Sequence, residues 1–107
     1  MHWIEIVRRC FDVGSVAYTR HARLEMKGEE FGHILEKEVH ETVCGGEVIE
    51  EYLGDAPYPS VLIFGRTQRN RPLHVVCAYD QDEDLLIIVT VYHPDPALWV
   101  DYRRRTH

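Results

Sequence analysis

Three apolar segments in the second half of the chain limit its fold more than any other feature. They are rich in β-branched residues, span residues 60–67, 72–79 and 85–92, and are separated only by QRNR and DQDED. Loops this short join antiparallel neighbours, because a parallel pair needs a crossover of about a dozen residues or more. Residues 47–53, EVIEEYL, add a strand whose three glutamates suit an exposed edge. We therefore predict a four-stranded antiparallel meander.

The last of these strands starts with LLIIVTV, and such continuous apolarity indicates a central strand that is covered on both faces. We expect helices on one face and, on the other, the C-terminal tail, a partner protein or a second copy of the chain in a homo-oligomer. The residues that we expect to be mostly buried are Val39, Val43, Val76, Ala78, Ile87, Ile88, Val89 and Val91.

The first half of the chain has helical periodicity. Apolar residues recur every three or four positions over residues 3–11, before Gly14, which suits the left-handed position that follows a helix. Thr19 is placed to cap a second helix that Gly28 ends or interrupts, and residues 34–43 carry a third amphipathic pattern.

Near the C-terminus, Asp95 followed by Pro96 is typical of a helix start, so residues 96–105 are expected to form a short last helix. A chain of 107 residues, 45% of them hydrophobic, can bury one core. We predict a single α+β domain over residues 1–107, in which two to three N-terminal helices pack on the meander.

Several classes of protein are disfavoured by the composition. No apolar run of about 18 residues occurs, so we expect neither a membrane span nor a secretory signal, but a cytoplasmic protein. Cys10, Cys44 and Cys77 are odd in number and form no C-x-x-C pair, as expected of reduced thiols. No motif such as H-E-x-x-H occurs, and we expect no metal or other cofactor.

The net charge of -6 argues against a protein that coats nucleic acid, because such proteins neutralise phosphates with an excess of lysine and arginine. The charges are segregated, however: residues 25–55 hold ten acids against Lys27 and Lys37, and the arginines gather in the second half. Arg66 and Arg71, at the tip of a hairpin, are candidates for binding RNA phosphates. An ordinary solvated surface is the alternative.

Four segments are informative when taken together: YTRHARLEM at 18–26, GEVIEEY at 46–52, RPLHVVCAYD at 71–80 and TVYHPDPALWVDYRRR at 90–105. In this order they resemble the bacterial proteins grouped as domain-of-unknown-function family 4258. Those proteins show a histidine-alanine pair with a methionine one turn later, and the motifs G-E-x-I-E-x-Y, R-P-L-H-V-V and T-V-Y-x-P-D-P-x-x-W. The resemblance is interrupted between the first two segments, where this chain is longer.

Members of that family look like the small RelE-type and BrnT-type toxins, and many are encoded beside a short zinc-finger protein of the antitoxin kind. The resemblance therefore implies the toxin-like component of a toxin-antitoxin pair, with a zinc-finger antitoxin as partner and RNA as the substrate of a metal-independent endoribonuclease. The alternative is a non-catalytic protein-protein interaction domain, which the negative net charge favours.

A ribonuclease of this kind needs a general base, a general acid and positive charge at the phosphate. His21 is the first catalytic candidate, and its neighbours Arg20 and Arg23 are candidate phosphate contacts. His74, in the middle of a strand, and Tyr92, at the end of the next one, complete the catalytic set. His74 could equally be a core histidine with satisfied ring nitrogens, and Tyr92 an aromatic lid on the core.

Overall fold

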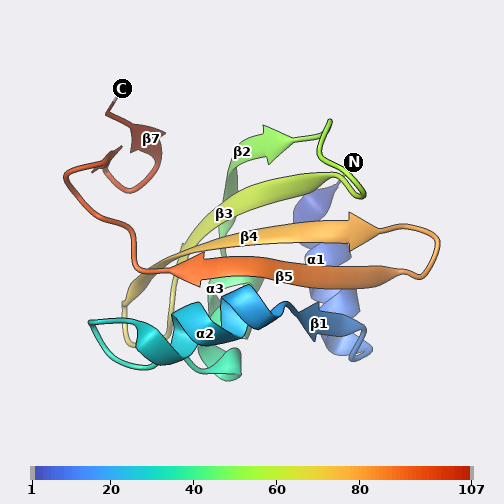
Figure 1. Cartoon of the computed structure of the whole chain (residues 1–107), viewed down its shortest axis with the longest axis horizontal. Helices are drawn as coiled ribbons and strands as arrows, with labels where there is room; N and C mark the ends of the chain where they lie inside the picture. Colours follow the sequence, from blue (N-terminus) through green and yellow to red (C-terminus); the bar gives the residue numbers. More distant parts are fainter. Residues whose placement is uncertain (1, 107) are drawn as a thin grey trace.

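A computed structural model describes residues 2–106 of the protein. Its main sheet has five strands in the order β1-β5-β4-β3-β2. Figure 1 shows α1 and α3 behind this sheet, α2 alongside β5, and the opposite face turned to the viewer. The elements are α1 (Trp3–Asp12), β1 (Val16–Tyr18), α2 (Arg20–Gly28), α3 (Glu36–Cys44), β2 (Glu47–Tyr52), β3 (Ser60–Arg66), β4 (Pro72–Asp80), β5 (Leu85–Tyr92), β6 (Trp99–Val100) and β7 (Arg104–Arg105).

The sheet is mixed, because β1 pairs in parallel with β5. The prediction of an α+β fold is confirmed, whereas the prediction of a four-stranded, wholly antiparallel sheet is wrong. Strands β2 to β5 pair antiparallel in chain order, with β2 at the edge. The missed strand, β1, has only three residues. That is too short for a recognisable alternation, and its partner lies far away in the sequence.

The helices start and stop at the residues that local chemistry favours. Gly14 takes a φ of 73° after α1, a left-handed conformation that glycine adopts without strain. The Thr19 hydroxyl accepts the Ala22 N–H at 3.0 Å and so caps α2, which ends at Gly28. The helices and one face of the sheet share a core that includes Val7, Cys10, Ala22, Met26, Val39, Val43, Ile63, Val75, Ile88 and Val91.

The end of α3 lies unusually close to β3, and two glycines permit this. A Cβ at Gly65 would be 2.2 Å from the carbonyl oxygen of Thr42, and a Cβ at Gly46 would be 2.6 Å from the same oxygen. Neither distance leaves room for a side chain against rigid backbone. Glycine at both positions therefore sets the separation between α3 and the sheet.

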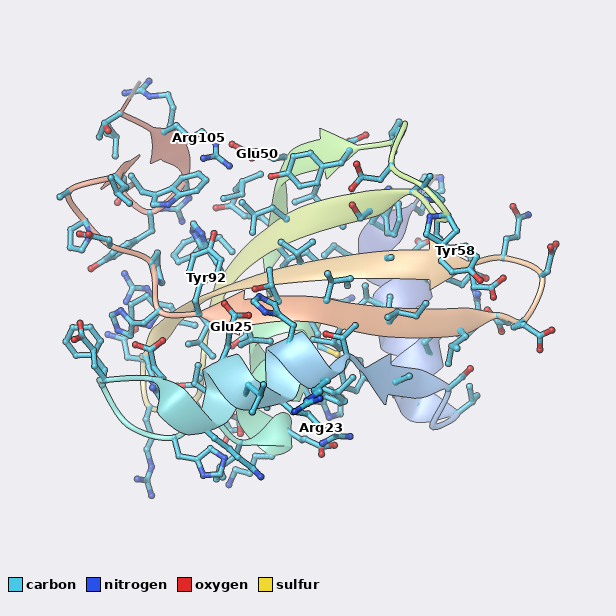
Figure 2. All side chains as sticks on the ribbon, in the orientation of Figure 1. Arg23, Glu25, Glu50, Tyr58, Tyr92 and Arg105 are labelled. Carbon is cyan, nitrogen blue, oxygen red and sulfur yellow. The ribbon has the colours of Figure 1, made fainter. Side chains whose placement is uncertain are left out.

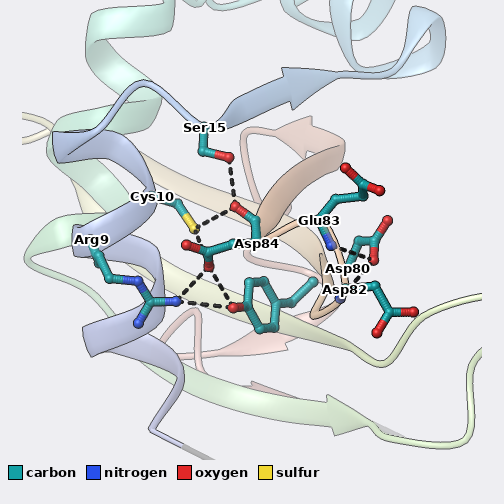
Figure 3. Close-up of polar contacts among 8 residues, drawn as sticks. Arg9, Cys10, Ser15, Asp80, Asp82, Glu83 and Asp84 are labelled. Atoms are coloured by element: carbon teal, nitrogen blue, oxygen red, sulfur yellow. Dashed lines mark hydrogen bonds and ion pairs between the residues drawn. The ribbon is translucent and has the colours of Figure 1, made fainter.

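Helix α1 is joined to the turn between β4 and β5 by a polar network (Figure 3). Arg9 donates to the Asp84 carboxylate at 2.6 Å and to the Tyr79 hydroxyl at 2.9 Å, while Tyr79 itself donates to Asp84 at 2.5 Å. The Ser15 hydroxyl donates to the Asp84 carbonyl. Because Ser15 comes directly before β1, this network holds the start of β1 beside the start of β5.

The predicted C-terminal helix over residues 96–105 is wrong. Residues 94–106, the C-terminal strap, begin with the expected turn, in which the Asp95 carboxylate accepts a backbone N–H. The chain then forms the β6-β7 hairpin instead. Asp101 and Tyr102, between these strands, have φ values of 55° and 61°, which a right-handed helix cannot contain.

Contacts with the sheet explain why the strap is not helical. The Trp99 side chain is buried, with its ring centroid 4.5 Å from that of His74. Arg103 forms an ion pair with Glu47, and Arg105 forms one with Glu50. A helix of this length is at best marginally stable on its own, so burial of a tryptophan decides the conformation of the segment. The strap thus covers part of the sheet face opposite α1 and α3, called the open face below.

The burial predictions are confirmed for five of the eight side chains, four of which belong to the core shared with the helices, whereas Ala78 is on the open face. The buried residues of the predicted set are Val39, Val43, Ala78, Ile88 and Val91. The others, Val76, Ile87 and Val89, are half-buried. Val76 and Ile87 belong to the open face beyond the strap, and Val89 is the extra residue of a β-bulge.

Candidate functional site

Helix α2 closes the edge of β5 beyond the point where β1 ends. Three side chains, from the two cap residues of α2 and from one residue within it, bond to backbone groups along this edge: Thr19 to the Val89 carbonyl (3.0 Å), Glu25 to the Val91 N–H (3.1 Å) and Glu29 to the His93 N–H (3.2 Å). The spacing of the two glutamates fits, since four helical residues rise about 6.0 Å and two strand residues about 6.6 Å. The sequence therefore fixes α2 against the sheet through two glutamates one turn apart.

One of these glutamates also orients His21. The His21 Nε2 lies 3.2 Å from Glu25 Oε1, the same oxygen that accepts the Val91 N–H and the Thr90 hydroxyl. Since the strand holds the carboxylate in place, the imidazole has a fixed neighbour although its side chain is 69% exposed. His21 is therefore an oriented and accessible imidazole.

His21 and Tyr92 meet in one open groove between α2 and the end of β5. The groove has a volume of about 580 Å³ and is lined by His21, Leu24, Glu25, Gly28, Glu29, Glu30 and Tyr92. Figure 2 shows Glu25 and Tyr92 near each other at this end of β5. Two of the three predicted catalytic residues are thus brought together from segments that are distant in sequence.

The third predicted catalytic residue, His74, is fully buried behind Tyr92. It lies directly opposite Tyr92 in the β4-β5 pair, with its Nδ1 3.1 Å from the Tyr92 hydroxyl. Its Nε2 lies 2.6 Å from the carbonyl oxygen of Tyr102 in the strap. Burial lowers the pKa of His74 and raises that of Tyr92 to about 12, so both groups are neutral near pH 7.

A polar cluster that sequence reasoning missed lies beside this pair. Arg105 binds both carboxylate oxygens of Glu50, at 2.8 and 3.1 Å, and Tyr52 donates to the same carboxylate. The hydrogen bond from Arg105 lowers the pKa of Glu50. Glu50, Tyr52 and Arg105 all lie close enough to act on the charge of Tyr92. The sequence signal that could have indicated this cluster is the G-E-x-I-E-x-Y motif, which contains both Glu50 and Tyr52.

A family model described as a domain of unknown function (DUF4258) matches residues 18–93, which is most of the chain. The chain belongs to this family. The matched residues run from the end of β1 to the residue after β5 and include His21, His74 and Tyr92, whereas α1 and the strap lie outside them. No curated protein and no solved structure matches the chain significantly.

The arginines of α2 in this DUF4258 protein do not line the groove. Arg20 is exposed at the first residue of the helix. Arg23 pairs with Glu36 at 3.0 Å and lies over the ring of Tyr18. Figure 2 shows Arg23 on the side of α2 away from Glu25 and Tyr92. Arg23 is therefore separated from the groove, although it is only two positions from His21 in the sequence.

The arginines of the hairpin tip have structural contacts of their own in the DUF4258 fold. Arg71 donates to the carbonyls of Gly32 and His33, and its guanidinium lies 3.5 Å from the Glu38 carboxylate. It thereby ties the loop before α3 to the sheet. Arg66 lies over the rings of Phe64 and Tyr102, next to the strap. Neither arginine lines the groove that holds His21.

The cysteines of this DUF4258 chain are placed where their reactivity is low. Cys10, Cys44 and Cys77 are free thiols. Burial raises the pKa of all three, that of Cys77 to about 12, which keeps them protonated and weakly nucleophilic. Within residues 2–106, His, Cys, Asp and Glu side chains form no group of three or more that is arranged to hold a metal ion. No helix in that range is long and apolar enough to span a membrane.

Proposed function

We propose that this protein is the toxin-like component of a bacterial toxin-antitoxin pair and cleaves RNA without a metal ion. The observation that carries the proposal is the groove that His21 and Tyr92 both line. General acid-base chemistry on a phosphodiester requires two proton-transfer groups that reach the same bond. An oriented imidazole and a neutral phenol in one accessible groove supply such a pair.

The chemistry that these groups would support is attack of a ribose 2′-hydroxyl on the adjacent phosphorus. One group removes the proton of the 2′-hydroxyl, and the other protonates the departing 5′-oxygen. The products are a 2′,3′-cyclic phosphate and a 5′-hydroxyl end. Arg105, beside Tyr92, is the cation of this region that can approach a phosphate, although it shares its charge with Glu50.

The test is cleavage of a single-stranded RNA by the purified full chain in the presence of a metal chelator. We expect cyclic phosphate products, and a loss of about 100-fold or more in rate for His21→Ala and for Tyr92→Phe. His2→Ala, which removes an exposed histidine before α1, is the matched control and keeps the wild-type rate. A wild-type protein that leaves RNA intact, or an active His21→Ala variant, contradicts the proposal.

The proposal also implies a protein partner and an effect on growth. We expect the neighbouring reading frame to encode a short zinc-finger protein of the antitoxin kind. Expression of the chain alone is expected to arrest growth, and His21→Ala or coexpression of the neighbour to relieve the arrest. Equal growth with the wild type and with His21→Ala, at matched levels of folded protein, would argue for the second candidate function.

That second candidate is a non-catalytic protein-protein interaction domain, and the charge of the groove favours it. Glu25, Glu29 and Glu30 line the groove, whereas none of its lining residues is a lysine or an arginine. Carboxylates repel a phosphate backbone and attract a cationic protein segment. Substitution of Glu29 and Glu30 by glutamine separates the two functions: RNA cleavage should rise, whereas binding of a basic partner should weaken.

A further inference from the structure

The two ring nitrogens of His74 have different partners, and these partners determine where its proton lies. The oxygen 2.6 Å from Nε2 belongs to the Tyr102 backbone carbonyl, which can only accept a hydrogen bond. Nε2 therefore carries the hydrogen. In a neutral imidazole the other nitrogen, Nδ1, then has a free lone pair.

The neutral ring is the form that this environment favours. His74 is enclosed by the rings of Phe64, Tyr92 and Trp99, and its exposed fraction is 0%. The charged groups that act on it are Glu50 on β2 and Arg105 on β7, and their effects oppose each other. Desolvation is the largest effect and lowers the pKa of His74 below its ordinary value of 6.5.

The direction of the bond to Tyr92 follows. Since Nδ1 is an acceptor, the hydroxyl 3.1 Å away must donate to it. The hydrogen of the Tyr92 hydroxyl points at His74, and the remaining lone pairs of its oxygen point elsewhere. A ligand that reaches this oxygen meets an acceptor, so Tyr92 can take up a proton but has none to offer.

We propose that Tyr92 and His74 form a proton relay that acts as the general base of this site, with the strap carbonyl of Tyr102 fixing the direction of transfer. This inference rests on the proposed function, which supplies RNA as the substrate. The ribose 2′-hydroxyl gives its proton to the Tyr92 oxygen, and Tyr92 gives its own proton to Nδ1 of His74. His21 is thereby left as the general acid.

The step balances in protons and bonds. The 2′-oxygen forms a bond to phosphorus as its bond to hydrogen breaks, and the bond from phosphorus to the 5′-oxygen breaks. The leaving 5′-oxygen takes a proton from the His21 imidazolium. His74 ends with one more proton and His21 with one fewer, and exchange with water restores both.

The relay gives the C-terminal strap a role in the reaction. The imidazolium formed at His74 is stabilised by the Tyr102 carbonyl and by the Glu50 carboxylate, which favours a positive charge there. Trp99 and the two ion pairs of the strap hold that carbonyl in place. His74 and the strap are positioning elements, because they act through Tyr92, whereas Tyr92 and His21 are the groups that contact the substrate.

The first experiment measures the proton position without reference to activity. Nitrogen-15 NMR of the full chain near pH 7.5 distinguishes a protonated Nε2 from a protonated Nδ1 for His74. We expect hydrogen on Nε2, and a shift of the Nδ1 signal when Tyr92→Phe removes its donor. Hydrogen on Nδ1, or an unchanged Nδ1 signal in Tyr92→Phe, overturns the inference whether or not RNA is cleaved.

The second experiment measures the relay in catalysis. His74→Gln keeps a polar side chain in the same place but cannot take up a proton. We expect kcat to fall about 100-fold with KM unchanged. We also expect the wild type, but not this variant, to lose rate as the pH falls from 6.5 through the lowered pKa of His74. His2→Gln, the same substitution at an exposed histidine before α1, is the control and should retain the wild-type kcat. Full activity of a folded His74→Gln variant overturns the relay. Absence of cleavage by the wild type refutes the proposed function, and the NMR experiment then decides the proton position on His74 by itself.

Discussion

The Glu25 carboxylate accepts the backbone N–H of Val91 at 3.1 Å, in the place where a neighbouring strand would supply a carbonyl. An unpaired strand edge attracts other chains, and proteins usually protect it. Here the protection comes from a helix, because Glu25 and Glu29 reach successive N–H groups of the same edge. The carboxylate that orients His21 is therefore first of all a structural group.

Glu25→Ala is expected to destabilise the fold by about 1–3 kcal/mol, because it leaves the Val91 N–H without its partner. Glu25→Gln retains an acceptor oxygen and should cost less. The measurement is urea unfolding at pH 7. Glu30→Ala, on an exposed residue of the same region, is the control. Equal stability of Glu25→Ala and Glu30→Ala would show that water replaces the carboxylate.

The stability of the protein should depend on pH through His74. Its folded pKa lies below the ordinary value of 6.5, so the unfolded chain binds a proton that the folded chain does not. The contribution of His74 to the free energy of unfolding is therefore complete above about pH 6.5, and it is lost as the pH falls through the folded pKa. Denaturant unfolding from pH 7.5 to 5 should show this decrease. His74→Gln should remove it, and a slope that persists in this variant would assign the effect to other groups.

Trp99→Ala should release the strap. The indole is buried against His74, and its loss is expected to cost about 3 kcal/mol, the lower end for such truncations, since the strap can relax. Trypsin should then cleave faster at Arg103, Arg104 and Arg105. Leu98→Ala, on the exposed neighbour, should leave the cleavage rate unchanged. Equal rates for both variants would mean that the strap is held by its ion pairs alone.

Gly65→Ala should be among the most damaging single-methyl additions in the chain. The new Cβ would lie 2.2 Å from the Thr42 carbonyl oxygen, so α3 or β3 must move, and we expect a loss of about 1–3 kcal/mol or more. Gly54→Ala is the matched control, because nothing lies within 4 Å of its Cβ position. Thermal unfolding compares the two variants, and a similar Tm would show that the backbone adapts easily.

Much of the fold could be predicted from local patterns, because the deciding interactions were local. The Thr19 cap, the turn at Gly14 and the short loops between β3, β4 and β5 are properties of neighbouring residues. The parallel β1 and the strap depend on partners distant in sequence. Residues 96–105 have a helix start signal, yet burial of Trp99 against His74 decides their conformation.

The site was predictable to a smaller degree. Residue types suggested His21, His74 and Tyr92, and the fold brings the first and last into one groove with the second behind them. Roles could not be assigned, since the proton on His74 is set by the Tyr102 carbonyl, which has no signature in the sequence. The contacts of Arg71 with the Gly32 and His33 carbonyls likewise have no signature in the sequence, and its role as a phosphate contact stays a prediction.

The parallel pairing of β1 with β5 also sets the order of events during synthesis. Val16 pairs with Leu86, 70 positions later, so β1 leaves the ribosome about 4–14 s before its partner at 5–20 residues per second. During that interval α2 has no edge on which its glutamates can bind. We therefore expect β1 and α2 to dock only after β5 has been synthesised, which makes this pairing a late step in folding.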